Sequence, residues 1–465
     1  MVADLEARRT YESDALVRHR AIPGLVVLPE TLEQVRAIVT LCHQRGVPFV
    51  ARGAGTGLSA GALPVEDGVL IVLSRMRRIL DVDVENQRVV VEPGVTNLAV
   101  THAVGGQGYY YAPDPSSQVV CTVGGNVAEN SGGAHCLKYG FTTHHVLGLE
   151  VVLPDGSLVH LGGEALDTPG YDLVGAFVGS EGTLGIATKI TLRILRRPER
   201  VETLLASFES TDAAGEAVSA VIGAGIVPAA VEMMDALSIQ ATEAAVHPGY
   251  PAGAGAILIV ELDGPAAEVA AQFEEVERLC RAVGCREIRI ARDDVERALL
   301  WKGRRSAFAA MARVSPNYYV QDGVIPRTAL PRVLRRIAEL AAAAGLRVAN
   351  VFHAGDGNLH PLVLYDAGEG ETERAEELAG RILEICLEHG GSITGEHGVG
   401  ADKKAAMPKM FLAADLHAMN LLRCAFDPAG LCNPGKLFPT PRLCGERPGP
   451  GRPHPLEQAG LGSVF

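Results

Sequence analysis

Residues 47–61 read Val47-Pro48-Phe49-Val50-Ala51-Arg52-Gly53-Ala54-Gly55-Thr56-Gly57-Leu58-Ser59-Ala60-Gly61, an apolar run that passes into a glycine-rich segment. The run 47–51 predicts a strand, and the helical spacing of apolar residues over 32–45, which ends at Gly46, predicts a helix before it. In the glycine-rich part, small residues let backbone N–H groups approach an anion closely. It has neither the G-x-G-x-x-G spacing of the dinucleotide fingerprint nor the Gly-Lys-Ser/Thr of a P-loop. We interpret it as a phosphate cradle, although glycine runs more often serve turns.

Further segments with the same small-residue character follow along the chain. Residues 112–117 read Ala-Pro-Asp-Pro-Ser-Ser, residues 122–133 read Thr-Val-Gly-Gly-Asn-Val-Ala-Glu-Asn-Ser-Gly-Gly, and residues 179–186 read Gly-Ser-Glu-Gly-Thr-Leu-Gly-Ile. Several such loops in one N-terminal region suit a long ligand with a diphosphate that is held by backbone amides.

The pattern of apolar runs predicts an α+β fold in more than one domain. Strands are expected at 69–73, 88–92, 146–153 and 182–195, and a boundary near Arg196–Arg200. Beyond it, strands at 203–208 and 256–261 alternate with helices at 212–222 and 266–283, which predicts a sheet with helices on one face. The last residues, from Thr440 to Phe465, are rich in Pro and Gly, and we expect them to be largely disordered.

Bulk properties limit the class of protein. A chain of 465 residues favours two or three domains. The net charge of −13 argues against nucleic acid or an anionic membrane as the main partner. The sequence has no apolar run of about 18 residues and no signal-peptide core at its start, so we expect a cytoplasmic protein without a spanning helix. Its nine cysteines include no Cys-x-x-Cys, so an iron–sulfur relay of its own is not expected.

A second motif, His353-Ala-Gly-Asp-Gly-Asn-Leu-His360, predicts a hairpin with a histidine at each foot, about 5 Å apart. Glu396 and His397 follow in a glycine-rich turn. Two imidazoles and a carboxylate are a common open ligand set for a catalytic metal ion. The alternative is that these are ordinary loop histidines, because His-x6-His is not a standard zinc spacing.

Taken in order, the first segments resemble the flavin-binding domain of the vanillyl-alcohol oxidase/p-cresol methylhydroxylase superfamily. Residues 353–361 (HAGDGNLHP), 395–400 (GEHGVG) and 433–437 (NPGKL) resemble motifs of the FAD-linked D-2-hydroxyacid dehydrogenases, above all the glycolate oxidase FAD-binding catalytic subunits and the FAD-linked D-lactate dehydrogenases. The resemblance implies a PCMH-type FAD-binding domain of two α+β subdomains at 15–196. It also implies a FAD-linked oxidase C-terminal domain for substrate and metal at 197–439.

By this resemblance, the small-residue loops hold FAD. The first loop is expected at the diphosphate, the second at the flavin and ribityl chain, and the third near the adenine. The residues implied are Arg52, Gly53, Ala54, Gly55, Thr56 and Gly57, then Pro113, Ser117, Thr122, Gly124, Gly125, Asn126 and Gly133, then Gly182 and Ile186. Some members tether FAD through a histidine of the first loop; this chain has none between His43 and His102, so non-covalent FAD is expected.

The resemblance also implies the catalytic residues. His353, His360 and Glu396 match the ligands of a divalent metal, with zinc as the first choice and manganese or iron as alternatives. His397 matches the general base and Arg304 the residue that grips the substrate carboxylate. These parts suit the oxidation of a 2-hydroxy acid, in which the hydroxyl loses a proton and the carbon loses a hydride to the flavin.

Two departures from the family pattern point to a small substrate. Relatives that act on hydroxyglutarate have an asparagine where this chain has Leu362, and a lysine where we align Val320. A second substrate carboxylate would then find few partners, which favours glycolate or D-lactate. The electron acceptor stays open between an iron–sulfur or other electron-transfer subunit, a quinone and oxygen. A homodimer, and peripheral attachment to the inner face of the membrane through a partner, are also left open.

Two other classes of function compete with this interpretation. The first is a catalytically silent flavin-binding accessory subunit of a redox complex, which would typically lack the motifs of the second domain. The other is a metal hydrolase in which the glycine-rich loops are purely structural.

Overall fold

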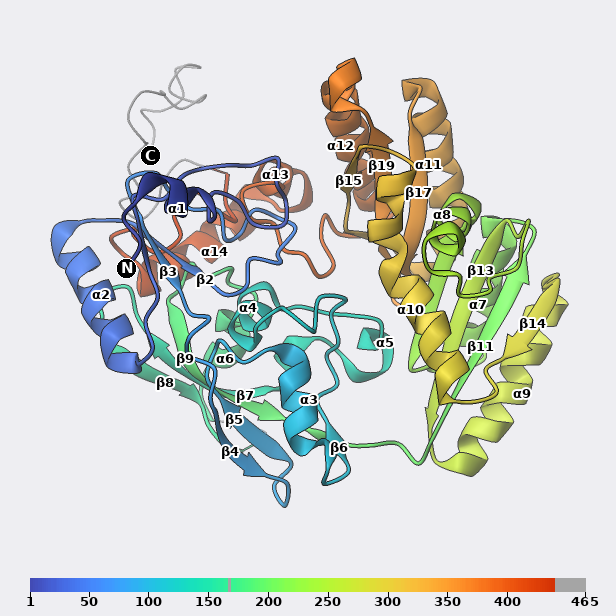
Figure 1. The fold of residues 1–465 in the computed structure, drawn as a ribbon, viewed down its shortest axis with the longest axis horizontal. Helices are drawn as coiled ribbons and strands as arrows, with labels where there is room; N and C mark the ends of the chain where they lie inside the picture. Colours follow the sequence, from blue (N-terminus) through green and yellow to red (C-terminus); the bar gives the residue numbers. More distant parts are fainter. Residues whose placement is uncertain (166–168, 440–465) are drawn as a thin grey trace.

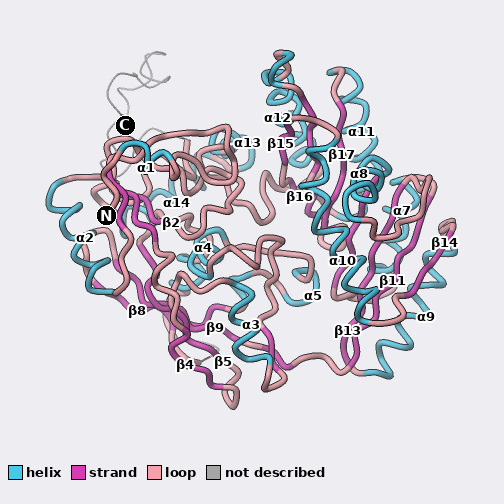
Figure 2. The backbone as a smooth tube through the Cα atoms, in the orientation of Figure 1, coloured by secondary structure: helices cyan, strands magenta, loops and turns pink. Residues whose placement is uncertain are grey.

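The computed structural model describes residues 1–165 and 169–439, which form two lobes (Figures 1 and 2). The first lobe contains a parallel sheet in the order β1-β3-β2 and an antiparallel sheet in the order β4-β5-β9-β7-β8. Their strands are β1 (Leu25–Val27), β2 (Phe49–Arg52), β3 (Val69–Val72), β4 (Ile79–Asp83), β5 (Arg88–Val91), β7 (Val146–Val152), β8 (Leu158–Gly162) and β9 (Ile186–Arg193). The predicted strands of this half are confirmed, with ends that differ by a few residues.

The helix before the first glycine-rich loop has the predicted bounds, α2 (Leu32–Arg45). Thr31 caps its start by accepting the N–H of Gln34, and Gly46 ends it in the left-handed region at φ +63°. The buried face of the helix packs with Phe49 of β2, so the glycine-rich loop leaves from a firmly packed strand. The other short elements here are α1 (Leu5–Arg9), α3 (Asn97–Gly105), β6 (Tyr109–Tyr110), α4 (Val123–Glu129), α5 (Cys136–Tyr139), α6 (Leu173–Phe177) and β10 (Leu195–Arg196).

The second lobe is built on one nine-stranded sheet in which the paired strands run antiparallel. The path β14-β11-β13-β12-β17-β18-β16 is joined by β19, which pairs with β17 and β15. The strands are β11 (Arg200–Phe208), β12 (Ala230–Asp235), β13 (Ala256–Gly264), β14 (Glu287–Ile290), β15 (Asn317–Val320), β16 (Gly323–Val324), β17 (Arg347–His353), β18 (Asn358–Leu359) and β19 (Pro361–Tyr365).

Helices cover both faces of this sheet, which corrects the prediction of helices on one face. Leu204 packs in one core and its neighbour Leu205 in the other, because β11 is buried on both sides. Such strands read as continuous apolar runs rather than as alternating ones. One face carries α7 (Thr211–Gly223), α9 (Ala266–Ala282), α11 (Leu330–Ala344) and α12 (Thr372–Glu388), and the other carries α8 (Ala236–Val246) and α10 (Asp294–Ala310). In Figure 1, α10 lies on the side of the sheet that faces the first lobe.

After the second lobe, the chain returns to the first one through α13 (Met407–Met410) and α14 (Ala413–Phe426) (Figure 1). Phe49 of β2 donates its N–H to Leu431 O at 2.9 Å and accepts the N–H of Asn433 at 2.8 Å. The domain boundaries at 15–196 and 197–439 stay a prediction. The structure adds that the segment around Leu431 and Asn433 pairs with a strand of the first lobe.

The remaining features of the fold concern turns, membranes and the tail. Turns of 3-10 helix lie at Thr142–His144, Met311–Arg313, Arg327–Ala329, Ala367–Glu369 and Lys404–Ala406. Within the described residues, none of the helices combines the length and the apolar character needed to cross a bilayer. The prediction of a disordered tail from Thr440 onward falls outside the described residues.

Candidate functional site

The motif at 353–360 forms the predicted hairpin. His353 ends β17 and pairs with Asn358 of β18, while Gly357 takes a positive φ of +80° in the turn. Asp356 accepts the N–H of Asn358 at 3.0 Å, so its carboxylate shapes the turn. The imidazole rings of His353 and His360 lie 5.2 Å apart between their centroids.

Glu396 from the later turn joins the two histidines. Its Oε1 lies 3.2 Å from Nε2 of His353 and 3.0 Å from Nε2 of His360. The other ring nitrogens face acceptors: Nδ1 of His353 lies 2.7 Å from Oε1 of Glu232, and Nδ1 of His360 lies 3.4 Å from the carbonyl oxygen of Gln321. Each Nδ1 is thereby placed to carry a proton, which leaves each Nε2 with its lone pair directed at the centre of the cluster.

These three donor atoms fit a divalent cation. Ligand atoms about 2.1 Å from an ion in tetrahedral geometry lie roughly 3.4 Å apart, close to the separations found here. Burial would raise the pKa of Glu396, but the two imidazoles hold it well below its ordinary value. Burial would lower the pKa of His353, yet Glu232 and Glu396 raise it well above its ordinary value. The negative charge of these two carboxylates, which favours a proton on this imidazole, also favours a metal ion.

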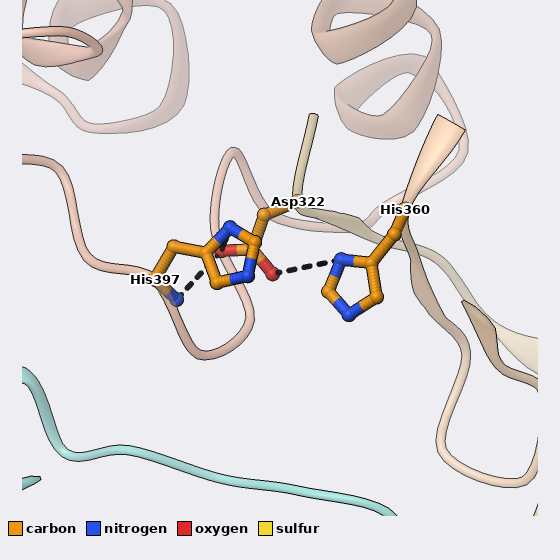
Figure 3. Close-up of side chains that lie close together, drawn as sticks. All are labelled: Asp322, His360 and His397. Carbon is orange, nitrogen blue, oxygen red and sulfur yellow. Dashed lines mark hydrogen bonds and ion pairs between the residues drawn. The ribbon is translucent and has the colours of Figure 1, made fainter. Parts of the chain in front are cut away.

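Asp322, which lies between β15 and β16, holds the turn that carries Glu396. It accepts the backbone N–H groups of Gly395 at 3.0 Å and His397 at 2.9 Å, and the hydroxyl of Thr394 at 2.5 Å. Figure 3 shows this carboxylate between His360 and His397, with its oxygens near one nitrogen of each residue. Asp322, His360 and His397 could form a second ligand set. Because Asp322 is already engaged by these donors and by Lys403, we assign it a structural role.

His397, the predicted base, lies against His360. Its ring stacks on that of His360 at 4.9 Å between centroids, and its Nδ1 makes no hydrogen bond within the described part of the chain. Burial lowers the pKa of His397 to about 4, so the ring is neutral near pH 7 and able to accept a proton.

A second buried carboxylate connects the predicted metal ligands to the predicted substrate arginine. Glu232 in β12 binds His353 through Oε1, and its Oε2 lies 2.7 Å from Nη2 of Arg304. Arg304 is 4% exposed, and its Nε has no hydrogen-bond partner among the described residues. With the imidazoles neutral, as metal binding requires, the carboxylates of Glu232, Asp322 and Glu396 and the cations of Arg304 and Lys403 leave one net negative charge in this network. A dication would make it positive, which suits an anionic substrate.

One cavity brings the glycine-rich loops and the histidine cluster together. From the first lobe, its lining includes the predicted residues Arg52, Gly53, Ala54, Gly55, Thr56, Gly57, Ser117, Thr122, Gly124, Gly125, Asn126, Gly182 and Ile186. From the second lobe it includes Arg304, Phe308, His360, Glu396 and His397. His353 is not part of this lining, but it contacts Glu396, which is. Most of the sequence-predicted cofactor residues thus share a single cavity with the predicted base and the predicted substrate arginine.

Two predicted flavin contacts lie outside this lining. The carbonyl oxygen of Pro113 accepts a hydrogen bond from Asn97 Nδ2 at 3.0 Å. Gly133 has φ +143°, and a Cβ there would lie 2.6 Å from the backbone of Asp114. Both residues shape the backbone next to the cavity, and their contact with the cofactor stays a prediction.

The first loop fits the diphosphate of FAD. Within the described residues, none of the hydrogen bonds uses the backbone N–H groups of residues 53–57, which are therefore available to an anion. A Cβ at Gly53 would lie 2.1 Å from Oγ1 of Thr122, so the close approach of the first two loops requires glycine there.

Sequence reasoning missed Glu232, Asp322 and Phe308. Glu232 was detectable as a lone charge inside the apolar run of β12, since a charge in such a place needs a partner. Asp322 similarly follows the apolar end of β15. Phe308 lies one helical turn after Arg304 on α10, so both reach the same side of the helix.

Two family models match the chain. The FAD binding domain matches residues 23–162, and the C-terminal domain of FAD linked oxidases matches residues 197–437. Glycolate oxidase subunit GlcD of Escherichia coli (strain K12) is 53% identical over 437 residues, which cover 94% of this chain and 88% of that protein. Its namesake in Bacillus subtilis (strain 168) is 40% identical, with 93% and 92% covered.

More distant similarities agree with these matches. The D-lactate dehydrogenase of Archaeoglobus fulgidus is 31% identical over 93% of this chain and 95% of its own length. The crystal structure of p-cresol methylhydroxylase with substrate bound superposes with a TM-score of 0.78 at 17% identity, covering 94% of this chain and 93% of that one. This likeness confirms the predicted PCMH-type fold.

Proposed function

The chain belongs to the family of FAD linked oxidases, and from this membership we propose that it oxidises a small D-2-hydroxy acid, glycolate or D-lactate, to the 2-oxo acid with the aid of a divalent metal. The observation that carries the proposal is the single cavity, which is lined by the flavin loops on one side and by His360, Glu396 and His397 on the other. The substrate would lie between them. When bound, FAD supplies the hydride acceptor.

Each polar residue of the second lobe then has a task. His353, His360 and Glu396 would hold the cation, zinc first and manganese or iron as alternatives, whose charge lowers the pKa of the substrate hydroxyl. His397 would take the hydroxyl proton on its ring, which burial keeps neutral. Arg304 would hold the substrate carboxylate through its guanidinium, aligned by Glu232.

Two apolar residues support the proposal that the substrate is small. Val320 of β15 and Leu362 of β19 lie directly opposite each other in the sheet, although the sequence separates them widely. Both are buried in the core against which Phe308 of the cavity lining packs, and neither is itself part of that lining. A second substrate carboxylate would find no charged partner at these positions, which supports glycolate or D-lactate over a dicarboxylic acid.

The electrons would leave to an acceptor other than a nicotinamide. The relatives in E. coli and B. subtilis are named as subunits, which supports a partner that accepts electrons, an iron–sulfur or other electron-transfer protein, with a quinone as the alternative. We place the protein in the cytoplasm, where such a partner could attach it to the inner face of the membrane.

The competing classes of function are less well supported. A metal hydrolase with structural glycine loops disagrees with the match of residues 23–162 to a FAD binding domain. A silent accessory subunit would have no reason to keep the cluster of His353, His360, Glu396 and His397 intact.

The test is a substrate screen combined with metal analysis on the purified protein. Glycolate and D-lactate should bleach the flavin absorbance near 450 nm and reduce a dye, whereas D-2-hydroxyglutarate should do so poorly. Chelation should abolish the reaction, and one divalent cation should restore it. Acid precipitation should release all flavin as free FAD. Failure of every small 2-hydroxy acid to bleach the flavin would disprove the proposal.

A further inference from the structure

The turn that carries Glu396 and His397 is held by carboxylates from both lobes. Asp322 of the second lobe holds its first half, as described above. Glu181, from the third glycine-rich loop of the first lobe, holds its second half. Its Oε1 accepts the N–H of Val399 at 2.7 Å, and its Oε2 accepts the N–H of Gly400 at 2.6 Å. Glu396 and His397 therefore sit between two anchors, only one of which belongs to their own lobe.

The backbone of Glu181 has a conformation of unfavourable energy, which indicates that contacts of the residue hold it there. Its φ of +53° lies in the left-handed region, which glycine adopts freely and other residues rarely do. Glycine would relieve this strain but would leave the N–H groups of Val399 and Gly400 without their acceptors. Strained residues of this kind persist where their surroundings hold them, characteristically at functional sites.

The same residue is fixed to the loops that line the flavin cavity. Glu181 lines the cavity itself. Its carbonyl oxygen accepts a hydrogen bond from Nδ2 of Asn433 at 2.6 Å, and this amide group also donates to the carbonyl oxygen of Gly61 at 3.0 Å. Gly61 lines the cavity as well, at the end of the first loop. Further along the turn, Asp402 donates its N–H to Ser59 O at 3.2 Å. The cofactor loops and the catalytic turn therefore share one set of contacts.

We propose that Glu181 is a positioning residue that transmits occupancy of the flavin site to the turn carrying Glu396 and His397. A ligand that orders the third glycine-rich loop also orders the carboxylate that receives Val399 and Gly400. By thermodynamic linkage, an ordered turn must in return favour the ligand. The consequence for metal affinity rests on the proposed function, whereas the consequence for the mobility of the turn does not.

The first test measures hydrogen exchange of the segment 394–400 in the full-length protein, with FAD and after removal of FAD, in the presence of a chelator. The variant is Glu181→Gln, which has the same shape but places an NH2 group against one of the two N–H donors. The control is Glu150→Gln in β7 of the same lobe, where the carboxylate pairs with Lys189 at 3.1 Å, away from the turn. FAD should slow exchange of this segment about tenfold in the wild type and in the control, but not in E181Q.

The outcomes separate this inference from the proposed function. Equal protection by FAD in E181Q and the wild type, or none in the wild type, would overturn the role of Glu181. A second arm measures the Kd for Zn²⁺ by competition with a chelating dye. FAD should tighten Zn²⁺ binding by about 5- to 150-fold in the wild type, and this factor should fall toward one in E181Q. If exchange behaves as expected but the wild type binds no divalent cation, Glu181 keeps its role and the metal part of the proposed function is wrong.

Discussion

Replacing Glu232 by glutamine tests whether the proposed metal site and the proposed substrate arginine depend on each other through this carboxylate. This carboxylate is 1% exposed and joins Nδ1 of His353 to the guanidinium of Arg304. In E232Q the amide oxygen can still accept the imidazole N–H. Its NH2 group then faces another donor, the guanidinium of Arg304. The variant therefore removes one charged contact, weakens the other and changes almost no volume.

The expected size of the effect follows from these contacts. A hydrogen bond from Arg304 to the substrate carboxylate would contribute about 1.5–3 kcal/mol, so losing the ion pair that orients Arg304 should lower kcat/KM roughly 10- to 150-fold. Weakened support of a ligating histidine typically lowers metal affinity about 10- to 100-fold. Stability should fall by about 3–5 kcal/mol, because Arg304 stays buried without its counter-charge. The double variant E232Q/R304Q should recover part of that loss, since no unpaired charge remains.

The assay is dye reduction with glycolate and D-lactate at saturating metal, beside metal titration and urea unfolding of the FAD-loaded protein. Excess metal should refill the cation site of E232Q without restoring kcat/KM, because Arg304 is still misplaced. Glu150→Gln is the control for a half-buried, ion-paired glutamate outside the site. If E232Q had wild-type kcat/KM and metal affinity, the link between His353 and Arg304 would have no functional meaning, and our account of the site would be wrong.

Three further predictions probe separate parts of the molecule. His397→Ala should keep the flavin absorbance but lower turnover about 10²- to 10⁴-fold in the dye assay; undiminished turnover would remove His397 as the base. Phe308→Ala should raise kcat/KM for 2-hydroxybutyrate relative to glycolate about tenfold, because it removes an apolar wall beside His360; an unchanged ratio would show that Phe308 does not limit substrate size. Burial raises the pKa of Asp14 to about 6, so the folded protein keeps a proton that the unfolded chain releases near pH 4, and the contribution of Asp14 to stability becomes less favourable as the pH rises from 4 to 6. Urea unfolding without FAD should therefore show Asp14→Asn gaining up to about 3 kcal/mol over the wild type between pH 4 and pH 7, and a gain that does not grow with pH would contradict this.

The sequence predicted most reliably those parts whose chemistry is local. The helix over residues 32–45 begins after a threonine cap and ends at a left-handed glycine, and both signals are residues directly next to the helix in the sequence. The hairpin at 353–360 was predictable for the same reason, because Gly357 and Asp356 encode the turn on their own. The assignment of helices to one face of the large sheet failed, because the run of buried residues in β11 is compatible with one covered face or with two.

The supporting carboxylates could not be placed from sequence, because their partners lie far away along the chain. Glu232 meets a histidine 121 residues later, and Glu181 meets residues 218 and 219 positions later. A lone acidic residue in an apolar run signals that a partner exists, but it carries no information about which one. The loop glutamate at 181 gave not even that signal, since its left-handed backbone appears only in the structure.

Near the cavity, the contacts that hold the lobes in register include ion pairs as well as the hydrogen bonds of Glu181. His135 of the first lobe lies between Asp114 of its own lobe, at 2.8 Å, and Glu261 of the second, at 3.1 Å, while Lys138 pairs with Asp263 at 2.5 Å. Apolar contacts tolerate sliding because they have no direction, whereas paired charges and hydrogen bonds fix both distance and angle. Hydride transfer requires the reacting atoms to meet at about 3–3.5 Å, and a displacement of about 1 Å can cost 100-fold in rate. A junction of directed contacts therefore suits an enzyme whose predicted cofactor loops and proposed metal ligands lie in different lobes.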